Sequence, residues 1–562
     1  MTWGWSDWVL LALLMVFGFF WLRTTPEFAA NLPQDAADFA ISAVNLLTEG
    51  RLGVTMYGSP QPTGRTIGLP LLLVPSYWVS GSFVGNGIYS ILVLALLTVG
   101  CVYYSARLLA GRLAAVVAAL FLLAHHGFRL YSQKIMSEVP AMGLVSLMLA
   151  LTVYLHWQRD RIWPYAALGI SWGLAIVIRS ENLLLVFPLL GLAAFRLLRL
   201  DWRRGLLVGL CALPWLVGQA MYNHHNYGSF RRSAYHWIGW FEKPSFALHN
   251  VTATGYWVKT RGYPPEMAAR MDGNLPFVLK TCASQIDNSM IFSRLTNWRA
   301  SGQAFYATLV SLRTVIGLVG IGVCCWLWKR RPQVRLFVMW LAGLGITTLV
   351  FYALFSWQEE RYLLRLLPLL VIANGIGAAH VAGLLRRVLP LGPQGSTFLV
   401  GGFVGALLLG VSLMSALHLV YRGDDNLLLY RTMRSVAQAI PSNAVVITNW
   451  DPLRVDEHIA KGTSRVILPL VGDWLRWPRD NATPVPTFPF VPLQEPSRLL
   501  DLLKGGRKAC LLLRNPFDFA PPPPEIALFG EHFALRPIAN YSTPQGQVIG
   551  TYLYELVPKI SQ

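Results

Sequence analysis

Two carboxylates, Asp35 and Asp38, stand near the start of NLPQDAADFAISAVNLLTEG, the segment 31–50. The segment predicts a helix, and residues three positions apart lie on neighbouring parts of a helix surface. A carboxylate that accepts a proton in the transition state contributes about 10²- to 10⁴-fold to a rate. The residues alone favour an N-cap with a box-like partner, and a general base is the competing interpretation. The two interpretations conflict, because a carboxylate held by backbone N–H groups is a weaker base.

The rest of this helix predicts how the acids are positioned. Phe39, Ala43, Leu46 and Leu47 recur at helical spacing and predict one apolar stripe, which packs on a bilayer or on other helices. Gly50 follows the stripe and predicts a C-cap that ends the helix.

Further charged residues stand at the edges of apolar segments. Glu138 lies in QKIMSEVP, Arg179 and Glu181 lie in VIRSENLLL, and Arg361 lies in WQEERYLLRLLPLL. Arg313 falls about two turns inside an apolar segment, where an unpaired charge is costly, so we expect it to face a cavity or a carboxylate. The arginines are candidates for phosphate contacts, because a guanidinium binds phosphate oxygens through paired N–H groups. Charges at span ends are otherwise ordinary interfacial residues.

The composition predicts a polytopic membrane protein. Of 562 residues, 54% are hydrophobic and 13% are charged, against about a quarter charged in soluble domains. The net charge of +19 is typical of membrane proteins whose cytoplasmic loops are rich in Lys and Arg. The sequence has no basic array with interleaved aromatic residues outside those loops, so it does not indicate nucleic-acid binding. Apolar runs long enough to cross about 30 Å of hydrocarbon predict about eleven spans. These are 6–23, 87–106, 113–127, 139–157, 163–179, 182–198, 205–222, 306–328, 336–355, 362–385 and 397–420.

The connections between spans predict the orientation. Arginine and lysine concentrate in alternate connections, and cytoplasmic loops carry such an excess. A cytoplasmic N-terminus places all of these connections inside, and it places the loops 24–86 and 223–305 and the tail after 421 outside. The candidate acids and arginines then share the outer face.

Two outer regions have distinct expected structures. TIGLPLLLVPSYWVSG (66–81) is apolar but proline-broken and too short to span, so it predicts a re-entrant or interfacial piece. The tail alternates short apolar runs with helical patterns, which predicts a small extracytoplasmic α/β domain over 422–562, after a membrane domain over 1–421. Its expected helices lie near 426–440, 453–461 and 497–504, and its expected strands are VVITNW (445–450), SRVILPL (464–470), KACLLLR (508–514) and QVIGTYLYEL (547–556).

The sequence predicts no soluble cofactor. The tail contains neither G-x-G-x-x-G nor G-x-x-x-x-G-K. The six cysteines have no metal-ligand spacing and predict no disulfide framework, with one bridge between Cys282 and Cys510 left open. We expect no metal cluster, although a hard divalent cation that bridges Asp35 and a phosphate is chemically reasonable.

An ordered set of motifs resembles a known family. In chain order the set is D-A-A-D-F with L-L-T-E-G, T-I-G-L-P-L-L-L, S-E-V-P, R-S-E, N-Y-G-S-F and E-R-Y-L-L-R-L-L-P. It resembles the GT-C superfamily of membrane glycosyltransferases, in the branch of the protein O-mannosyltransferases, the aminoarabinose transferases and their RgtA-like bacterial relatives. The resemblance covers residues 1–420 and rests on the order of the set.

The resemblance implies roles for the acids. The family's catalytic acid in the first outer loop maps onto Asp35. Ala36 stands where the family commonly has a second acid, so Asp38, one turn on, is the candidate replacement. The family's acid at the head of the fourth span maps onto Glu138.

The resemblance also implies a site for the donor phosphate. The family's R-Y-x-x-P element maps onto Arg361 and Tyr362. Arg365 stands where a proline is common, one turn beyond Arg361, and is a candidate for a second phosphate contact. Arg179 and Arg313 complete the donor-phosphate candidates.

The implied activity is that of a glycosyltransferase in a bacterial plasma membrane. The expected donor is a monosaccharide on a polyprenyl phosphate or diphosphate, and the expected acceptor is a glycan, a lipid or a protein on the extracytoplasmic face. Asp35 would deprotonate the acceptor, and the anomeric configuration would invert. The other expected partners are membrane lipids, and nucleic acid is not expected. Two other classes stay open: a flippase or transporter of lipid-linked glycans, with charges along a path to both faces, and a non-catalytic scaffold, which does not need Asp35.

Overall fold

The structure is a computed structural model of the full chain. It describes residues 3–30, 34–56, 59–63, 65–158, 161–198, 200–227, 319–353, 364–388, 430–448, 455–469, 496–504, 506–514, 532–541 and 551–559, with positions 230, 395, 399, 401, 402 and 530.

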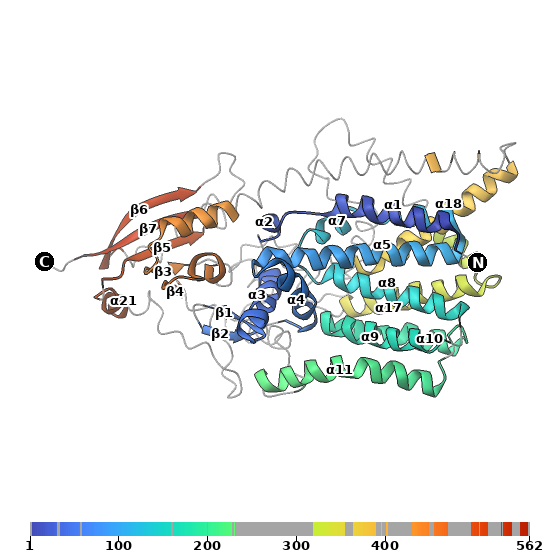
Figure 1. Cartoon of the computed structure of the whole chain (residues 1–562), viewed down its shortest axis with the longest axis horizontal. Helices are drawn as coiled ribbons and strands as arrows, with labels where there is room; N and C mark the ends of the chain where they lie inside the picture. The colour runs from blue at the N-terminus through green and yellow to red at the C-terminus, as the bar shows by residue number, and fades with distance from the viewer. Residues whose placement is uncertain are drawn as a thin grey trace.

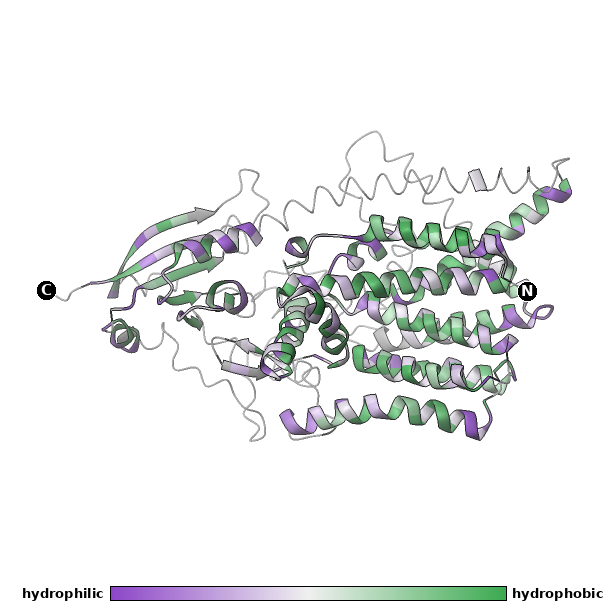
Figure 2. Cartoon of the chain, viewed as in Figure 1, coloured by the Kyte–Doolittle hydropathy of each residue, from purple (hydrophilic) through white to green (hydrophobic). Residues whose placement is uncertain are grey.

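Apolar helices that run side by side form the larger part of the molecule (Figure 1). Five helices are long and apolar enough to cross a membrane in the described part of the chain. Figure 2 shows these helices hydrophobic along most of their length. The prediction of a polytopic membrane protein is confirmed, while the last predicted span, 397–420, lies almost wholly outside the described residues. The helices are α1 (Trp5–Leu22), α5 (Ile88–Ala110), α6 (Arg112–Ala124), α8 (Glu138–Trp157), α9 (Trp163–Ile178), α10 (Val186–Ala194), α11 (Trp202–Tyr227), α17 (Pro332–Ala353) and α18 (Leu367–Val388).

The centre of this bundle is α8. It is apolar on all sides, and 83% of its most hydrophobic window is buried, against 22% for α1 and 11% for α11. A helix that is hydrophobic all round belongs in an interior. Small residues allow close packing elsewhere in the bundle. A Cβ at Gly375 of α18 would lie 2.3 Å from the Ala114 carbonyl oxygen of α6.

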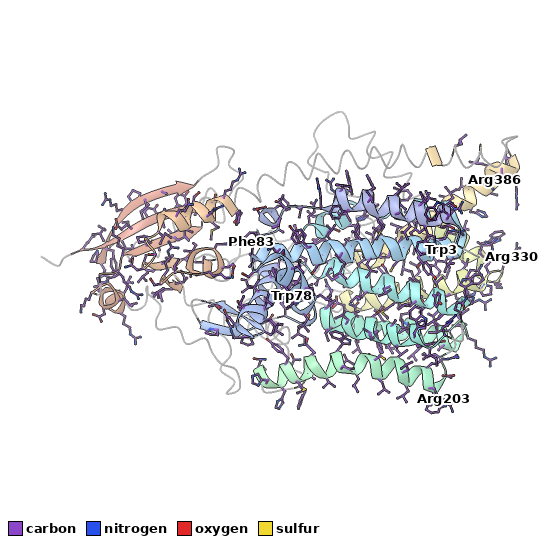
Figure 3. All side chains as sticks on the ribbon, in the orientation of Figure 1. Trp3, Trp78, Phe83, Arg203, Arg330 and Arg386 are labelled. Carbon is purple, nitrogen blue, oxygen red and sulfur yellow. The ribbon has the colours of Figure 1, made fainter. Side chains whose placement is uncertain are left out.

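Positive residues gather at the end of the bundle that holds the N-terminus. Figure 3 shows Arg203, Arg330 and Arg386 at that end, near Trp3, and shows Trp78 and Phe83 at the opposite end. This distribution agrees with the predicted segregation of cations to one membrane face.

A buried acid organises the first helix at this end. Asp7 of α1 is fully buried and accepts from Arg107 Nε and Arg112 Nε, each at 2.8 Å, and from the Gly4 backbone N–H at 3.0 Å. The two arginines flank the turn between α5 and α6. Asp7 therefore fastens α1 to both helices.

Asp7→Asn is expected to lower the thermal unfolding temperature, because a charge-assisted hydrogen bond is worth about 1.5–3 kcal/mol and an amide cannot serve both guanidinium groups. Unfolding of the purified protein in detergent, followed by intrinsic fluorescence, measures this. Asp501→Asn is the matched control, since its pair with Lys504 is solvent-exposed. Equal unfolding temperatures for the two variants would contradict the role of Asp7.

Short elements cover the other end of the bundle, where α3 and α4 lie across it (Figure 1). Every residue of α3 from 36 to 45 is buried, and Gly50 has φ +65°, which confirms the predicted C-cap. Leu47, in the last turn, is 37% exposed, so Phe39 and Ala43 pack on the protein while Leu47 does not. The elements here are α2 (Pro26–Ala29), α3 (Gln34–Glu49), β1 (Gly53–Met56), β2 (Ser59–Pro62), α4 (Gly68–Ser80), η1 (Val84–Gly87) and α7 (His126–Ser132).

The segment expected to be re-entrant or interfacial forms the short helix α4, with Pro75 inside it. Trp78 is 76% exposed, and Tyr77 is buried and donates to the Val84 carbonyl at 2.7 Å. One side of α4 thus packs on the protein while the other presents an aromatic ring outward.

The described part of the tail contains one five-stranded sheet in the order β4-β3-β5-β7-β6. β3 is parallel to β4 and β5, while β7 is antiparallel to β5 and β6. Alternate residues face opposite sides, so Val446 packs towards the helix over 430–439 and Ile447 packs towards α21. The elements are β3 (Val445–Thr448), η5 (Asp456–Ala460), β4 (Val466–Pro469), α21 (Pro496–Leu503), β5 (Ala509–Arg514), β6 (Phe533–Tyr541) and β7 (Thr551–Pro558).

This sheet differs from the sequence analysis in two places. The expected strands pair as β3, β4, β5 and β7, but β6 was not predicted, because Arg536 and Pro537 break its alternation on an edge strand with a bulge. Cys510 is a buried free thiol in β5, so the bridge to Cys282 is not formed. Burial raises the pKa of the Cys510 thiol to about 11. The predicted boundary at 421 and 422 lies outside the described residues.

Arg465 caps the C-terminal end of the helix over 430–439. Arg465 Nε donates to the Pro441 carbonyl at 2.9 Å, Nη1 to Ile459 at 2.6 Å, and Nη2 to Ala437 at 2.8 Å and to Ile440. Carbonyls at a helix C-terminus have no partner inside the helix. Arg465 satisfies several of them and ties the helix to the segment before β4.

Candidate active site

The first candidate acid, Asp35, is the second residue of α3. The helix begins at Gln34, so Asp35 lies within its first turn and not at the N-cap position. The role of Asp35 as a general base stays a prediction.

The second acid, Asp38, is buried and already bonded. Its Oδ1 accepts from Thr63 Oγ1 at 2.6 Å and from Ser42 Oγ at 3.2 Å. Thr63 follows β2, and its hydroxyl also accepts from the Arg65 backbone N–H at 3.2 Å. Asp38 therefore holds the β1–β2 hairpin against α3. The methyl group of Ala36, the position where the family commonly has a second acid, is also fully buried.

Thr63→Val is expected to destabilise the end of the bundle that holds α3 by about 1–3 kcal/mol, because it removes the 2.6 Å hydrogen bond to the buried Asp38 carboxylate. The unfolding temperature in detergent measures the effect. Thr63→Ser keeps the hydroxyl and is expected to behave like the unaltered protein, so equal losses in both variants would show that packing of the methyl group matters instead.

The third acid, Glu138, begins α8 and is 4% exposed. Arg179 Nη1 donates to Glu138 Oε1 at 3.1 Å, and Arg179 Nε donates to Glu181 Oε1 at 2.5 Å. The two carboxylates sit beside one guanidinium, so the formal charge of this trio is −1. Arg179 thereby fixes where the Glu138 carboxylate points, at the junction of α8, α9 and η2 (Ser180–Leu185).

A hydrogen bond joins the segment after β2 to the end of α9, next to Arg179. Thr66 Oγ1 donates to the Ile178 carbonyl at 2.8 Å, one residue before Arg179. A Cβ at Gly68 would lie 2.5 Å from the Val177 carbonyl oxygen, so only glycine lets α4 approach the end of α9 this closely. The segment 63–68, whose Thr63 bonds to Asp38, is thus in direct contact with the end of α9 just before Arg179.

Arg365 and Arg179 are the two donor-phosphate candidates that lie within the described residues. Arg365 is 4% exposed, and its Nε donates to Thr348 Oγ1 of α17 at 2.9 Å. Its neighbour Leu364 packs on α7, since a Cβ at Gly127 would lie 3.0 Å from Leu364 Cδ2. Three other donor-phosphate candidates, Arg313, Arg361 and Tyr362, lie outside the described residues.

The described side chains give no divalent-ion site. Nowhere in the described ranges do three His, Cys, Asp or Glu side chains converge. Asp38 and Glu138 are engaged by protein donors, and a hard cation needs several free oxygens. The divalent cation thus stays an expectation that concerns Asp35.

The sequence analysis did not single out Thr63 or Arg129. Thr63 bonds an acid 25 positions away, and no periodicity reveals such a pair. Arg129 lies in α7, between two predicted spans, with its guanidinium carbon 3.9 Å from the Trp21 ring centroid. A cation in a short outer connection was the available signal for Arg129.

Part of the membrane region is similar to a known family. Residues 79–219 match the sequence profile described as dolichyl-phosphate-mannose-protein mannosyltransferase. The matched part runs from the end of α4 into α11 and includes Glu138 and Arg179. No curated protein sequence matches the chain.

Solved structures share the fold over nearly the whole chain. ArnT from Cupriavidus metallidurans in the apo state aligns with a TM-score of 0.54 and 14% identity, over 98% of both chains. The same protein bound to undecaprenyl phosphate aligns with a TM-score of 0.54 and 13% identity, over 98% of both chains. The Archaeoglobus fulgidus oligosaccharyltransferase tethered with an acceptor peptide aligns with a TM-score of 0.51 and 13% identity, over 98% of this chain and 74% of the oligosaccharyltransferase chain. The likeness confirms a polytopic membrane fold of the GT-C type, while the count of about eleven spans and the extracytoplasmic place of the tail stay predictions.

Proposed function

We propose that this chain, a GT-C superfamily glycosyltransferase of the ArnT and protein mannosyltransferase type, transfers a monosaccharide from a polyprenyl-phosphate or diphosphate donor. The observation that carries the proposal is the gathering of Asp35, the Glu138–Arg179 pair and buried Arg365 at one end of an apolar bundle of this fold. Undecaprenyl phosphate bound to the similar ArnT supports the donor class.

In the proposed reaction, Asp35 takes the proton of the acceptor hydroxyl. The acceptor oxygen attacks the anomeric carbon in line, the bond from that carbon to the phosphate oxygen breaks, and the configuration inverts. A positioned base contributes about 10²- to 10⁴-fold to such a step. Water must be excluded, because hydrolysis competes with transfer.

Arginines balance the charge that develops on the leaving phosphate. Arg365 is buried next to the start of α18, and a guanidinium there stabilises an oxyanion strongly because little water competes. Arg361, Tyr362 and Arg313 complete this proposed set. We assign Arg179 a positioning role first, since its donors already serve Glu138 and Glu181.

The proposed orientation places the N-terminus in the cytoplasm and the reaction outside. The support is the group of Arg203, Arg330 and Arg386 at the N-terminal end of the bundle (Figure 3). The region 422–562 is then an extracytoplasmic α/β domain, and the acceptor, a glycan, a lipid or a protein, reaches the site from that side.

The test uses the purified full chain in liposomes with a radiolabelled polyprenyl-phosphate monosaccharide. Label is expected to move from the donor lipid to an added acceptor extract of envelope glycans, lipids and proteins. Transfer is expected on the same side of the membrane as the tail. Added protease identifies that side, because it removes the tail only where the tail is exposed to it. Folded protein that moves no label from any polyprenyl-phosphate sugar would overturn the proposal.

A further inference from the structure

The outer end of α1 carries an arginine that the proposed reaction does not use. Arg129 of α7 stacks on Trp21, and the Trp21 indole is itself fixed, because its Nε1 donates to the Leu123 carbonyl at 3.0 Å. Figure 1 shows α7 beside the C-terminal end of α1. Arg129 therefore rests on a rigid aromatic surface at the outer ends of α1 and α6.

Two donor groups of Arg129 are buried without a partner. In the part of the chain that the structure describes, Nε and Nη1 have no hydrogen-bond acceptor. Burial lowers the pKa of Arg129 to about 10, so the side chain is still a cation at neutral pH. Buried N–H groups without acceptors are costly, and stacking on an indole offsets part of that cost only. A bound anion would supply the missing acceptors.

The surroundings of Arg129 favour an anion with an apolar tail. Phe17 stacks on Trp21 with ring centroids 5.9 Å apart, and Phe17 and Phe20 are 46% and 59% exposed. Arg23, at the end of α1, adds a second cation 5.1 Å from the Phe20 ring centroid. Aromatic rings with arginines at a span end lie at the level of lipid headgroups. Phosphate oxygens have the geometry that an arginine fork binds.

We propose that Arg129 binds the phosphate of a membrane lipid whose hydrocarbon chain lies along Phe17 and Trp21 of α1. Arg129 differs from the proposed donor contacts in its partners, because Arg365 bonds to Thr348 of α17 and Arg179 contacts Glu138 and Glu181. Two lipids carry the required chemistry: a polyprenyl phosphate and an anionic phospholipid of the outer leaflet. The inference does not depend on the proposed reaction.

The test counts lipids on the purified full chain by native mass spectrometry. The probes are undecaprenyl phosphate, phosphatidylglycerol and diacylglycerol, which lacks a phosphate. Arg129→Gln is expected to weaken one phosphate-lipid site about tenfold, the effect of losing a charge-assisted contact, and to leave diacylglycerol unaffected. Arg203→Gln is the matched control, since Arg203 also stacks on a tryptophan, at 5.3 Å, but at the opposite end of the bundle (Figure 3).

The outcomes separate the lipid sources from a structural role. Loss of undecaprenyl phosphate alone assigns the site to the polyprenyl lipid, and loss of phosphatidylglycerol as well assigns it to phospholipids in general. Unchanged binding of both phosphate lipids overturns the proposal. In lipid-free detergent, Arg129→Gln should unfold no earlier than the unaltered protein, because it removes an unpaired buried charge. Earlier unfolding both with and without lipid would mark Arg129 as structural and also overturn the proposal.

Discussion

Asp35→Asn is expected to lower kcat for sugar transfer by about 10²- to 10⁴-fold, the contribution of a positioned general base. Asparagine keeps the shape of the side chain but cannot accept the hydroxyl proton. Binding of the polyprenyl-phosphate donor should change little, because the proposed phosphate contacts come from arginines. Single-turnover transfer from a labelled donor separates the chemical step from donor binding.

The neighbouring acid supplies the control for this experiment. Asp38→Asn removes the same charge from the same helix, but Asp38 is bonded to Thr63 and Ser42. We therefore expect Asp38→Asn to lower the unfolding temperature and Asp35→Asn to leave it nearly unchanged. Full transfer by Asp35→Asn would exclude Asp35 as the base. An equal loss of transfer by two well-folded variants would assign the chemistry to both acids.

Arg179→Met is expected to destabilise the protein by about 3–5 kcal/mol, because removal of one partner leaves buried charges uncompensated. Two carboxylates lose their cation in this variant: the side chains of Glu138 and Glu181 are 2% and 8% exposed. Transfer should fall as well, since the Glu138 carboxylate loses the donor that orients it. Chemical unfolding in detergent and transfer by the folded fraction measure the two effects separately.

Neutral partners test whether charge is the cause. Adding Glu138→Gln and Glu181→Gln to Arg179→Met should restore most of the stability, because no buried charge is then unpaired. Transfer should stay low if Glu138 is a site residue. Lys504→Met, which breaks an exposed pair with Asp501, should cost at most about 1 kcal/mol. A loss in Arg179→Met no larger than this control would contradict the role of Arg179.

The membrane helices could be predicted from the sequence because a bilayer imposes their length and apolarity. The predicted span 139–157 is α8 (Glu138–Trp157), and 163–179 is α9 (Trp163–Ile178). Charge placement then located Glu138 and Arg179 at the same end of neighbouring helices. Their direct contact could not be predicted, since it depends on the turn between α9 and η2.

Features that depend on long-range partners were missed. The bond between Asp38 and Thr63 joins residues 25 positions apart, and neither residue type indicates the other. β6 has an exposed edge, so its sequence lacks the continuous apolar pattern of β5.

The glycine contacts have a consequence for how substitutions in this chain will be interpreted. At Gly68, Gly85 and Gly375, an added Cβ would lie within 2.5 Å of a backbone carbonyl oxygen from another segment. A screen of every single replacement should therefore find these positions as intolerant as the acids, although a glycine offers no catalytic group. A position near Asp38 or Arg179 can then be intolerant because two backbones are in close contact there, or because its side chain takes part in catalysis. Only an assay that measures folding and transfer separately distinguishes these two causes.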